Sequence, residues 1–153
     1  VLYQGSPGVL ASEPGWIGES NQAGAAYGNS VSTAGDVNGD GYSDVLVEAP
    51  PFDAGLPEQV RAFMYLGSEN GLTSSFAWSS NGGGPYTYIG NVASAGDVNG
   101  DGYDDVIVGH PTSNVFGRAY LYLGSPAGLS MMPAWTGPTG IWCRLSPSTA
   151  RNG

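Results

Sequence analysis

Short runs of β-branched and aromatic residues, separated by glycine-rich turns, form the basic pattern of this chain. Two runs, Val45-Leu46-Val47 and Val106-Ile107-Val108, are uninterrupted apolar triplets of the kind found in buried strands. Residues 30–34 and 91–95 precede them at matching distances and are also strand-like in composition. No segment has sustained helical periodicity, and 26 glycines with 11 prolines suit many tight turns. The pattern predicts an all-β chain.

Two copies of one acidic segment lie between these predicted strands. Residues 36–44 read DVNGDGYSD and residues 97–105 read DVNGDGYDD. Oxygen donors at positions 1, 3, 5 and 9, with glycine at position 6, can surround a hard cation such as Ca²⁺. The expected ligands are Asp36, Asn38, Asp40, the main-chain carbonyl of Tyr42 and Asp44 in the first loop, and Asp97, Asn99, Asp101, the main-chain carbonyl of Tyr103 and Asp105 in the second.

The flanking residues distinguish these loops from EF-hands. An EF-hand needs a glutamate at position 12 and a helix on each side. Val47 and Val108 occupy position 12 here, inside predicted strands. We therefore expect β-hairpins whose turns hold two Ca²⁺ ions per chain, which would change the formal charge from −9 to −5. The alternative is a pair of Asp/Asn/Gly-rich turns that bind nothing.

The repeated unit is longer than the acidic segment. Asp36 and Asp97 are 61 residues apart, and each Gly-Ser pair precedes a tryptophan by the same interval. These tryptophans, which we expect to pack between sheets, are Trp16, Trp78 and Trp135. One unit reads as strand, acidic turn, strand, connector, strand, turn and a last strand with tryptophan. Four short strands with this period favour β-propeller blades of four antiparallel strands.

The flanks of the acidic segments resemble the FG-GAP repeats of integrin alpha chains. The "FG" element corresponds to Tyr27-Gly28 and Ile89-Gly90, and the "GAP" element to Glu48-Ala49-Pro50 and Gly109-His110-Pro111. The resemblance covers residues 1–137. It implies a propeller with calcium in the turn between the first and second strands of each blade, and a role in adhesion to proteins or, in lectin-like members, to glycans.

The repeats predict about two and a half blades. Residues 1–20 would supply the last two strands of one blade, 25–80 and 87–137 two complete blades, and 138–153 a non-repeat tail that is either a cap or a cloning remnant. A closed propeller has four to eight blades. The chain is therefore either part of a longer array completed by flanking repeats, or one member of a homo-oligomeric ring completed by other copies.

The composition of the chain disfavours several classes of function. Thirteen acidic residues against four basic ones disfavour binding to nucleic acid, and the absence of a long apolar run predicts no membrane insertion. Sites of this kind saturate at roughly 10⁻⁴–10⁻³ M Ca²⁺, which favours an extracellular or cell-surface protein, although no signal peptide opens the sequence. His110 is expected to be structural and Asp104 to face solvent, so no catalytic set emerges. We predict a calcium-binding structural and adhesion module rather than an enzyme; a lectin-like module is the alternative, and a calcium-dependent hydrolase is a weaker one.

Overall fold

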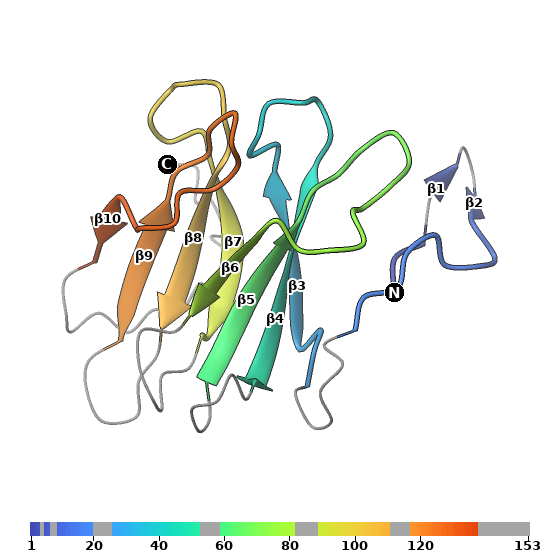
Figure 1. Cartoon of the computed structure of the whole chain (residues 1–153), viewed down its shortest axis with the longest axis horizontal. Helices are drawn as coiled ribbons and strands as arrows, with labels where there is room; N and C mark the ends of the chain where they lie inside the picture. The colour runs from blue at the N-terminus through green and yellow to red at the C-terminus, as the bar shows by residue number, and fades with distance from the viewer. Residues whose placement is uncertain are drawn as a thin grey trace, which may run out of the picture.

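The computed structural model consists of β-strands and connecting turns (Figure 1). It describes residues 1–3, 5–6, 9–19, 26–52, 59–81, 89–110 and 117–137, so the predicted tail at 138–153 lies outside the described residues. Within these ranges no helix is long and apolar enough to cross a membrane. The strands are antiparallel throughout, which confirms the all-β class and the four-stranded sheets expected for propeller blades.

The first large sheet has its strands in sequence order. They are β3 (Ser30–Gly35), β4 (Asp44–Phe52), β5 (Gln59–Tyr65) and β6 (Trp78–Asn81). The acidic segment at 36–43 joins β3 to β4. Thr33 pairs with Val45 and Gly35 pairs with Asp44, so the register of the two strands shifts between Thr33 and Gly35. Gly35 has φ +81°, a backbone conformation that favours glycine at such a bulge.

The second large sheet repeats the first. Its strands are β7 (Asn91–Gly96), β8 (Asp105–His110), β9 (Arg118–Tyr122) and β10 (Trp135–Thr136). The same register shift recurs opposite Asp105, between Ser94 and Gly96. The two sheets lie side by side, with both acidic loops at the same edge (Figure 1).

A shorter segment precedes the two sheets. Leu2 and Trp16 form an isolated antiparallel bridge, at positions that correspond to Met64 and Trp78 in the first sheet. Between them, β1 (Gly5–Ser6) and β2 (Val9–Leu10) form a small hairpin that projects from the rest of the chain (Figure 1). This hairpin has no counterpart in the turns that follow β5 and β9.

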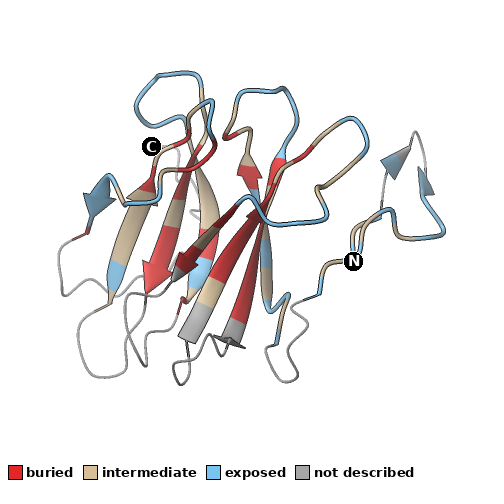
Figure 2. Ribbon diagram, viewed as in Figure 1, coloured by how far each residue is buried: buried red, intermediate tan, exposed pale blue. Residues whose placement is uncertain are grey.

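The larger of two hydrophobic clusters fills the space between the sheets (Figure 2). Leu46, Met64 and Trp78 from the first sheet join Val106, Val108 and Tyr122 from the second. A smaller cluster of Val47, Ala49, Phe63 and Tyr65 lies on the opposite face of the first sheet, where Trp16 packs against it. Strand β4 is therefore packed on both faces, which explains its uninterrupted apolar triplet.

Two of the three repeated tryptophans connect neighbouring units as expected. Trp78 is 3% exposed, meets Tyr122 edge-on at 4.9 Å between ring centroids and donates its indole N–H to Ser130 O at 3.0 Å. Trp16 makes the equivalent contacts with Tyr65 and with Thr73 O. Trp135 is 48% exposed, so its expected burial between sheets is wrong for this chain. The reason is that no further sheet covers that side of β10 within the described residues.

Candidate metal loops

The first acidic loop is folded around the carboxylate of Asp36. Its Oδ1 accepts the backbone N–H groups of Gly39 at 2.7 Å and Asp40 at 3.1 Å, and its Oδ2 accepts that of Gly41 at 2.8 Å. Gly39 and Gly41 have φ of +75° and +89°, which turns their N–H groups toward the carboxylate. The loop therefore wraps its backbone donors around its first residue.

Asn38 and Asp40 hold the middle of the same loop. The Asn38 amide donates to Asp40 Oδ2 at 2.9 Å, and Asp40 Oδ1 accepts the backbone N–H of Tyr42 at 3.0 Å. The backbone N–H of Asp40 also donates to Asn38 Oδ1 at 3.2 Å. Tyr42, whose carbonyl is the predicted main-chain ligand, closes the turn and is 42% exposed.

Asp44 ends the loop in a different environment. It is fully buried, and its two carboxylate oxygens accept the backbone N–H groups of Val37 at 3.0 Å and Gly67 at 2.8 Å. Asp44 thus ties the start of the acidic loop to the turn after β5. Burial raises the pKa of Asp44; the two N–H bonds lower it, and the charges of Asp40 and Asp36 raise it further, with a net upward shift.

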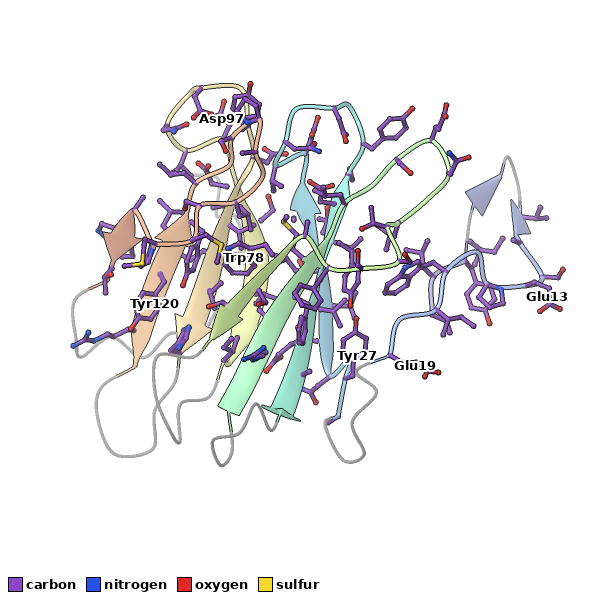
Figure 3. The ribbon with its side chains drawn as sticks, in the orientation of Figure 1. Glu13, Glu19, Tyr27, Trp78, Asp97 and Tyr120 are labelled. Atoms are coloured by element: carbon purple, nitrogen blue, oxygen red, sulfur yellow. The ribbon has the colours of Figure 1, made fainter. Side chains whose placement is uncertain are left out.

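The second loop repeats these contacts one by one. Asp97 accepts N–H groups from Gly100, Asp101 and Gly102, and Asn99 pairs with Asp101. Asp101 accepts the N–H of Tyr103, and buried Asp105 accepts those of Val98 and Gly124. The N–H of Gly102, followed by those of Asp101 and Gly100, lowers the pKa of exposed Asp97, which lies at the loop edge in Figure 3.

The fit to a cation can be judged from these contacts. Within the described ranges, no group of three or more His, Cys, Asp or Glu side chains is arranged to hold a metal ion. The donor chemistry suits Ca²⁺, because every side-chain donor is an oxygen and a carboxylate has lone pairs beyond those used by N–H groups. The charges of Asp36 and Asp40 raise the pKa of Asp44, and a bound cation would offset this effect.

The first loop also binds the second sheet, a role that sequence reasoning missed. Asp104, expected in solvent, accepts the backbone N–H of Asp36 at 2.8 Å through Oδ2, and its own N–H donates to Asp36 O at 3.0 Å. The N–H of Ser125 donates to Val37 O at 3.0 Å. A Cβ on Gly35 would collide with the Asp104 carboxylate. The one signal in the sequence was an acid at position 8 of the second loop, where the first has Ser43.

His110 is the last residue of β8 and Glu48 is the middle residue of β4, so neither belongs to an acidic loop. His110 is 4% exposed and meets Tyr120 edge-on at 4.6 Å, which agrees with a structural role. Glu48 is 2% exposed, and its Oε2 has no hydrogen-bond partner among the described residues. Burial raises its pKa, while a hydrogen bond with the Asn29 side chain lowers it, and the net shift is upward.

Comparison with known proteins identifies what the repeats resemble. The profile of the FG-GAP repeat family matches residues 27–62 and 89–122, which contain both acidic loops. Integrin alpha-3 of Cricetulus griseus is 34% identical over 136 residues, 87% of this chain and 12% of the relative. Integrin alpha-4 of Xenopus laevis is 32% identical over 110 residues, 70% of this chain and 10% of the relative. Integrin alpha pat-2 of Caenorhabditis briggsae is 36% identical over 114 residues, 71% of this chain and 9% of the relative. The chain thus spans about a tenth of the length of these relatives.

Proposed function

Because this chain belongs to the integrin alpha-like FG-GAP repeat family, we propose that its two acidic loops bind Ca²⁺ and that the ions brace the blades of an adhesion module. The observation that carries the proposal is that the carboxylates of Asp36, Asp40 and Asp44 lie in one nine-residue loop already folded by its own N–H groups, where like charges repel one another. A divalent ion would remove this repulsion without requiring the backbone to refold.

The proposed ligands are those that the sequence indicates. Asp36, Asn38, Asp40, the carbonyl of Tyr42 and Asp44 would hold one ion, and Asp97, Asn99, Asp101, the carbonyl of Tyr103 and Asp105 the other. When bound, the ion supplies positive charge that links the start of each loop to its end. Asp44 and Asp105 also contact the turns after β5 and β9, so the same charge would indirectly stabilise both strand connections at the loop edge of each sheet.

The proposed role is structural and adhesive. In the relatives that the comparison names, such repeats belong to integrin alpha chains, and we place this chain in the same setting: an extracellular or cell-surface module that presents a propeller face to a protein or glycan. No catalytic role is part of the proposal. At a Ca²⁺ concentration about a hundred times Kd, each site would add about 2.7 kcal/mol to the free energy of unfolding.

Calorimetric titration with CaCl₂ tests the cation binding. We expect two binding events in the full chain and one in each of Asp40→Asn and Asp101→Asn. Glu13→Gln is a matched control, because it removes the same unit of charge from an exposed position outside both loops. If the native chain gives no heat of binding with CaCl₂, or if Glu13→Gln loses a binding event as the loop variants do, the assignment is contradicted.

Adhesion is tested separately by immobilising the Ca²⁺-loaded chain. We expect retention of a protein or glycan from panels of extracellular matrix proteins and glycans, and release by a chelator. If the double variant Asp40→Asn/Asp101→Asn still binds the protein or glycan without Ca²⁺, adhesion does not depend on the metal loops.

A further inference from the structure

The two acidic loops contact each other directly, through the end of the second loop and the start of the first. Asp104 accepts the backbone N–H of Asp36 through Oδ2 at 2.8 Å and donates its own N–H to Asp36 O at 3.0 Å. Asp36 is the residue whose carboxylate gathers the N–H groups of the first loop. The second loop therefore holds the backbone of the first loop at the residue around which that loop is folded.

The Tyr103 ring makes another contact with the first loop. It lies against Gly39, because a Cβ added to Gly39 would stand 2.6 Å from Tyr103 Cε1. Gly39 donates its N–H to Asp36 Oδ1 at 2.7 Å, so the ring lies against one of the donors that fold the loop. Tyr103 is half-buried in this position, whereas Tyr42, at the same place in the first loop, is exposed.

The turn after β9 links a proposed ligand of the second loop to the backbone of the first. Asp105 Oδ1 accepts the N–H of Gly124 at 2.9 Å. The next residue, Ser125, donates its N–H to Val37 O at 3.0 Å, and the Val37 side chain is fully buried. A change at Asp105 therefore reaches the first loop through two adjacent residues of one turn.

We propose that Tyr103 and Asp104 are positioning residues for the first cation loop, so that Ca²⁺ at the second loop strengthens Ca²⁺ binding at the first. This rests on the proposed function, since it takes both loops as cation sites. The Tyr103 carbonyl is a proposed ligand, so an ion at the second loop would fix Tyr103 and Asp104 against Gly39 and Asp36. The first loop would then lose less conformational freedom when it binds its own ion. The strengthening is reciprocal, because coupling between two binding sites acts equally in both directions.

Charge opposes this coupling only weakly. An ion at the second loop changes the formal charge of its ligand carboxylates, Asp97, Asp101 and Asp105, from −3 to −1, which reduces their attraction for a cation at the first loop. The occupied loop remains negative, and exposed charges are screened over about 8 Å at physiological salt. Coupling through the contacts of Asp104 should therefore persist at high salt, while the opposing effect of charge should shrink.

NMR titration of each loop with CaCl₂ tests the coupling. The amide signals of Gly41 and Gly102 report on the first and second loops separately, because each N–H donates to the first carboxylate of its own loop. Asp101→Asn is expected to empty the second loop. For a coupling factor of about five, the Ca²⁺ concentration that half-saturates the Gly41 signal should be about two- to fivefold higher in Asp101→Asn than in the native chain. Charge alone predicts the opposite, since the empty variant loop is more negative than the occupied native loop.

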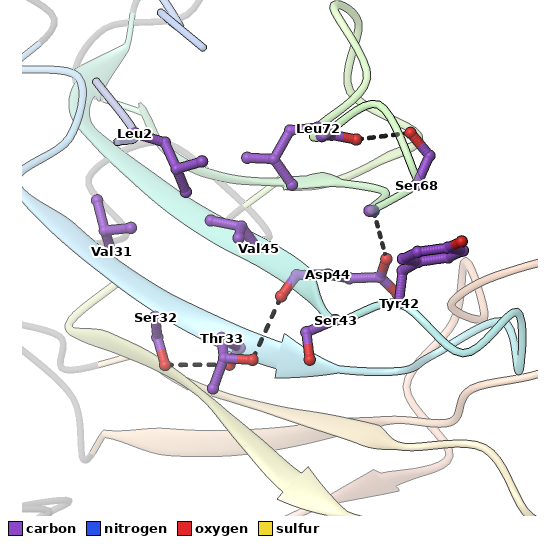
Figure 4. A pocket seen from close by; sticks show the side chains of 12 residues that line it. Leu2, Val31, Ser32, Thr33, Tyr42, Ser43, Asp44, Val45, Ser68 and Leu72 are labelled. Carbon is purple, nitrogen blue, oxygen red and sulfur yellow. Dashed lines mark hydrogen bonds between the residues drawn. The ribbon is translucent and has the colours of Figure 1, made fainter. Parts of the chain in front are cut away.

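Variants at position 8 of the loops separate a positioning role from a merely structural one. In an Asp104→Ala background, Asp101→Asn should no longer change the half-saturation of the Gly41 signal. Asp104→Asn keeps one acceptor oxygen and should retain part of the coupling. Ser43→Ala is the matched control and should leave the coupling intact, because Ser43 holds the same position in the first loop, lines a cavity of about 460 Å³ (Figure 4) and makes no hydrogen bond among the described residues.

Gly39→Ala and Gly100→Ala test the contact of the Tyr103 ring. Both glycines have φ +75°, so the two substitutions impose the same backbone strain. A Cβ on Gly39 collides with the Tyr103 ring, whereas a Cβ on Gly100 meets nothing within 4 Å among the described residues. We expect the Ca²⁺ affinity of the first loop in Gly39→Ala to fall about fivefold more than that of the second loop in Gly100→Ala.

The possible outcomes distinguish this inference from the proposed function. If both glycine signals respond to CaCl₂ but neither half-saturation depends on the other loop, the coupling is refuted and the two cation sites remain. Coupling of full strength in Asp104→Ala, or equal losses of affinity in Gly39→Ala and Gly100→Ala, would overturn the positioning role of the residue concerned. If neither signal responds to CaCl₂, the proposed function fails and the coupling fails with it.

Discussion

The bond between the Asp104 carboxylate and the Asp36 N–H predicts a measurable loss of stability on substitution. Asp104→Ala removes an acceptor that lies 2.8 Å from the donor and is half-buried between the sheets. Hydrogen bonds to charged groups contribute roughly 1.5–3 kcal/mol, and water can replace part of the bond at a half-buried site, so we expect a loss of about 1.5 kcal/mol. For a domain of this size that loss lowers Tm by ~3–6 °C.

The assay is urea unfolding followed by tryptophan fluorescence, with a chelator present so that cations do not contribute. Asp104→Asn retains one acceptor oxygen and should lose about half as much. Ser43→Ala is the matched control, because Ser43 holds the same loop position, is exposed and makes no hydrogen bond among the described residues. Its expected effect is within about 0.5 kcal/mol. Equal losses in Asp104→Ala and Ser43→Ala would refute the role of Asp104 as a link between sheets.

Two further predictions use contrasts within the chain. Trp78→Phe should lower the free energy of unfolding by ~1–3 kcal/mol, because it loses buried area and the bond to Ser130 O. Trp135→Phe, at the exposed equivalent position, should change the free energy of unfolding by no more than about 0.5 kcal/mol in dilute solution. Equal decreases of Tm in thermal melts of the two variants would contradict this prediction. For Glu48, whose folded-state pKa lies above the ordinary 4.5, the folded state binds more protons than the unfolded state between 4.5 and the raised value. Stability of the native chain relative to Glu48→Gln should therefore fall as pH rises through that window and level off above it, and urea midpoints with no such pH dependence would be inconsistent with a buried carboxyl.

Local patterns in the sequence were sufficient for the strands and the loops. The apolar triplets at 45–47 and 106–108 are buried strands because each lies between neighbouring strands and packs against a second layer. The connector between the second and third strands of the first sheet is short, since β4 runs to Phe52 and β5 begins at Gln59. A register shift between Ala49 and Phe52 accommodates the two prolines, which cannot donate to a regular ladder.

Contacts between units could not be read from the sequence in the same way. Asp104 and Asp36 are 68 residues apart, and nothing in the local pattern distinguishes an acid that faces solvent from one that accepts an N–H across two sheets. The exposure of Trp135 also depends on what lies next to its sheet and not on its own surroundings. The shared positions of Trp16, Trp78 and Trp135 predicted equal packing, but the described chain provides a neighbour for only the first two.

The backbone of each acidic loop connects metal chemistry to the order of the sheets. Asp36 uses its carboxylate to fold its own loop, and uses its backbone N–H and carbonyl to bind Asp104 of the next sheet. Any change that reorganises the first loop must therefore disturb the contact between sheets, because both depend on the same residue. Occupation of the first loop by a cation should consequently alter the strength of its contact with Asp104, and a loss of stability in Asp104→Ala that is the same in Ca²⁺ and in chelator would show that the loop and the contact act independently.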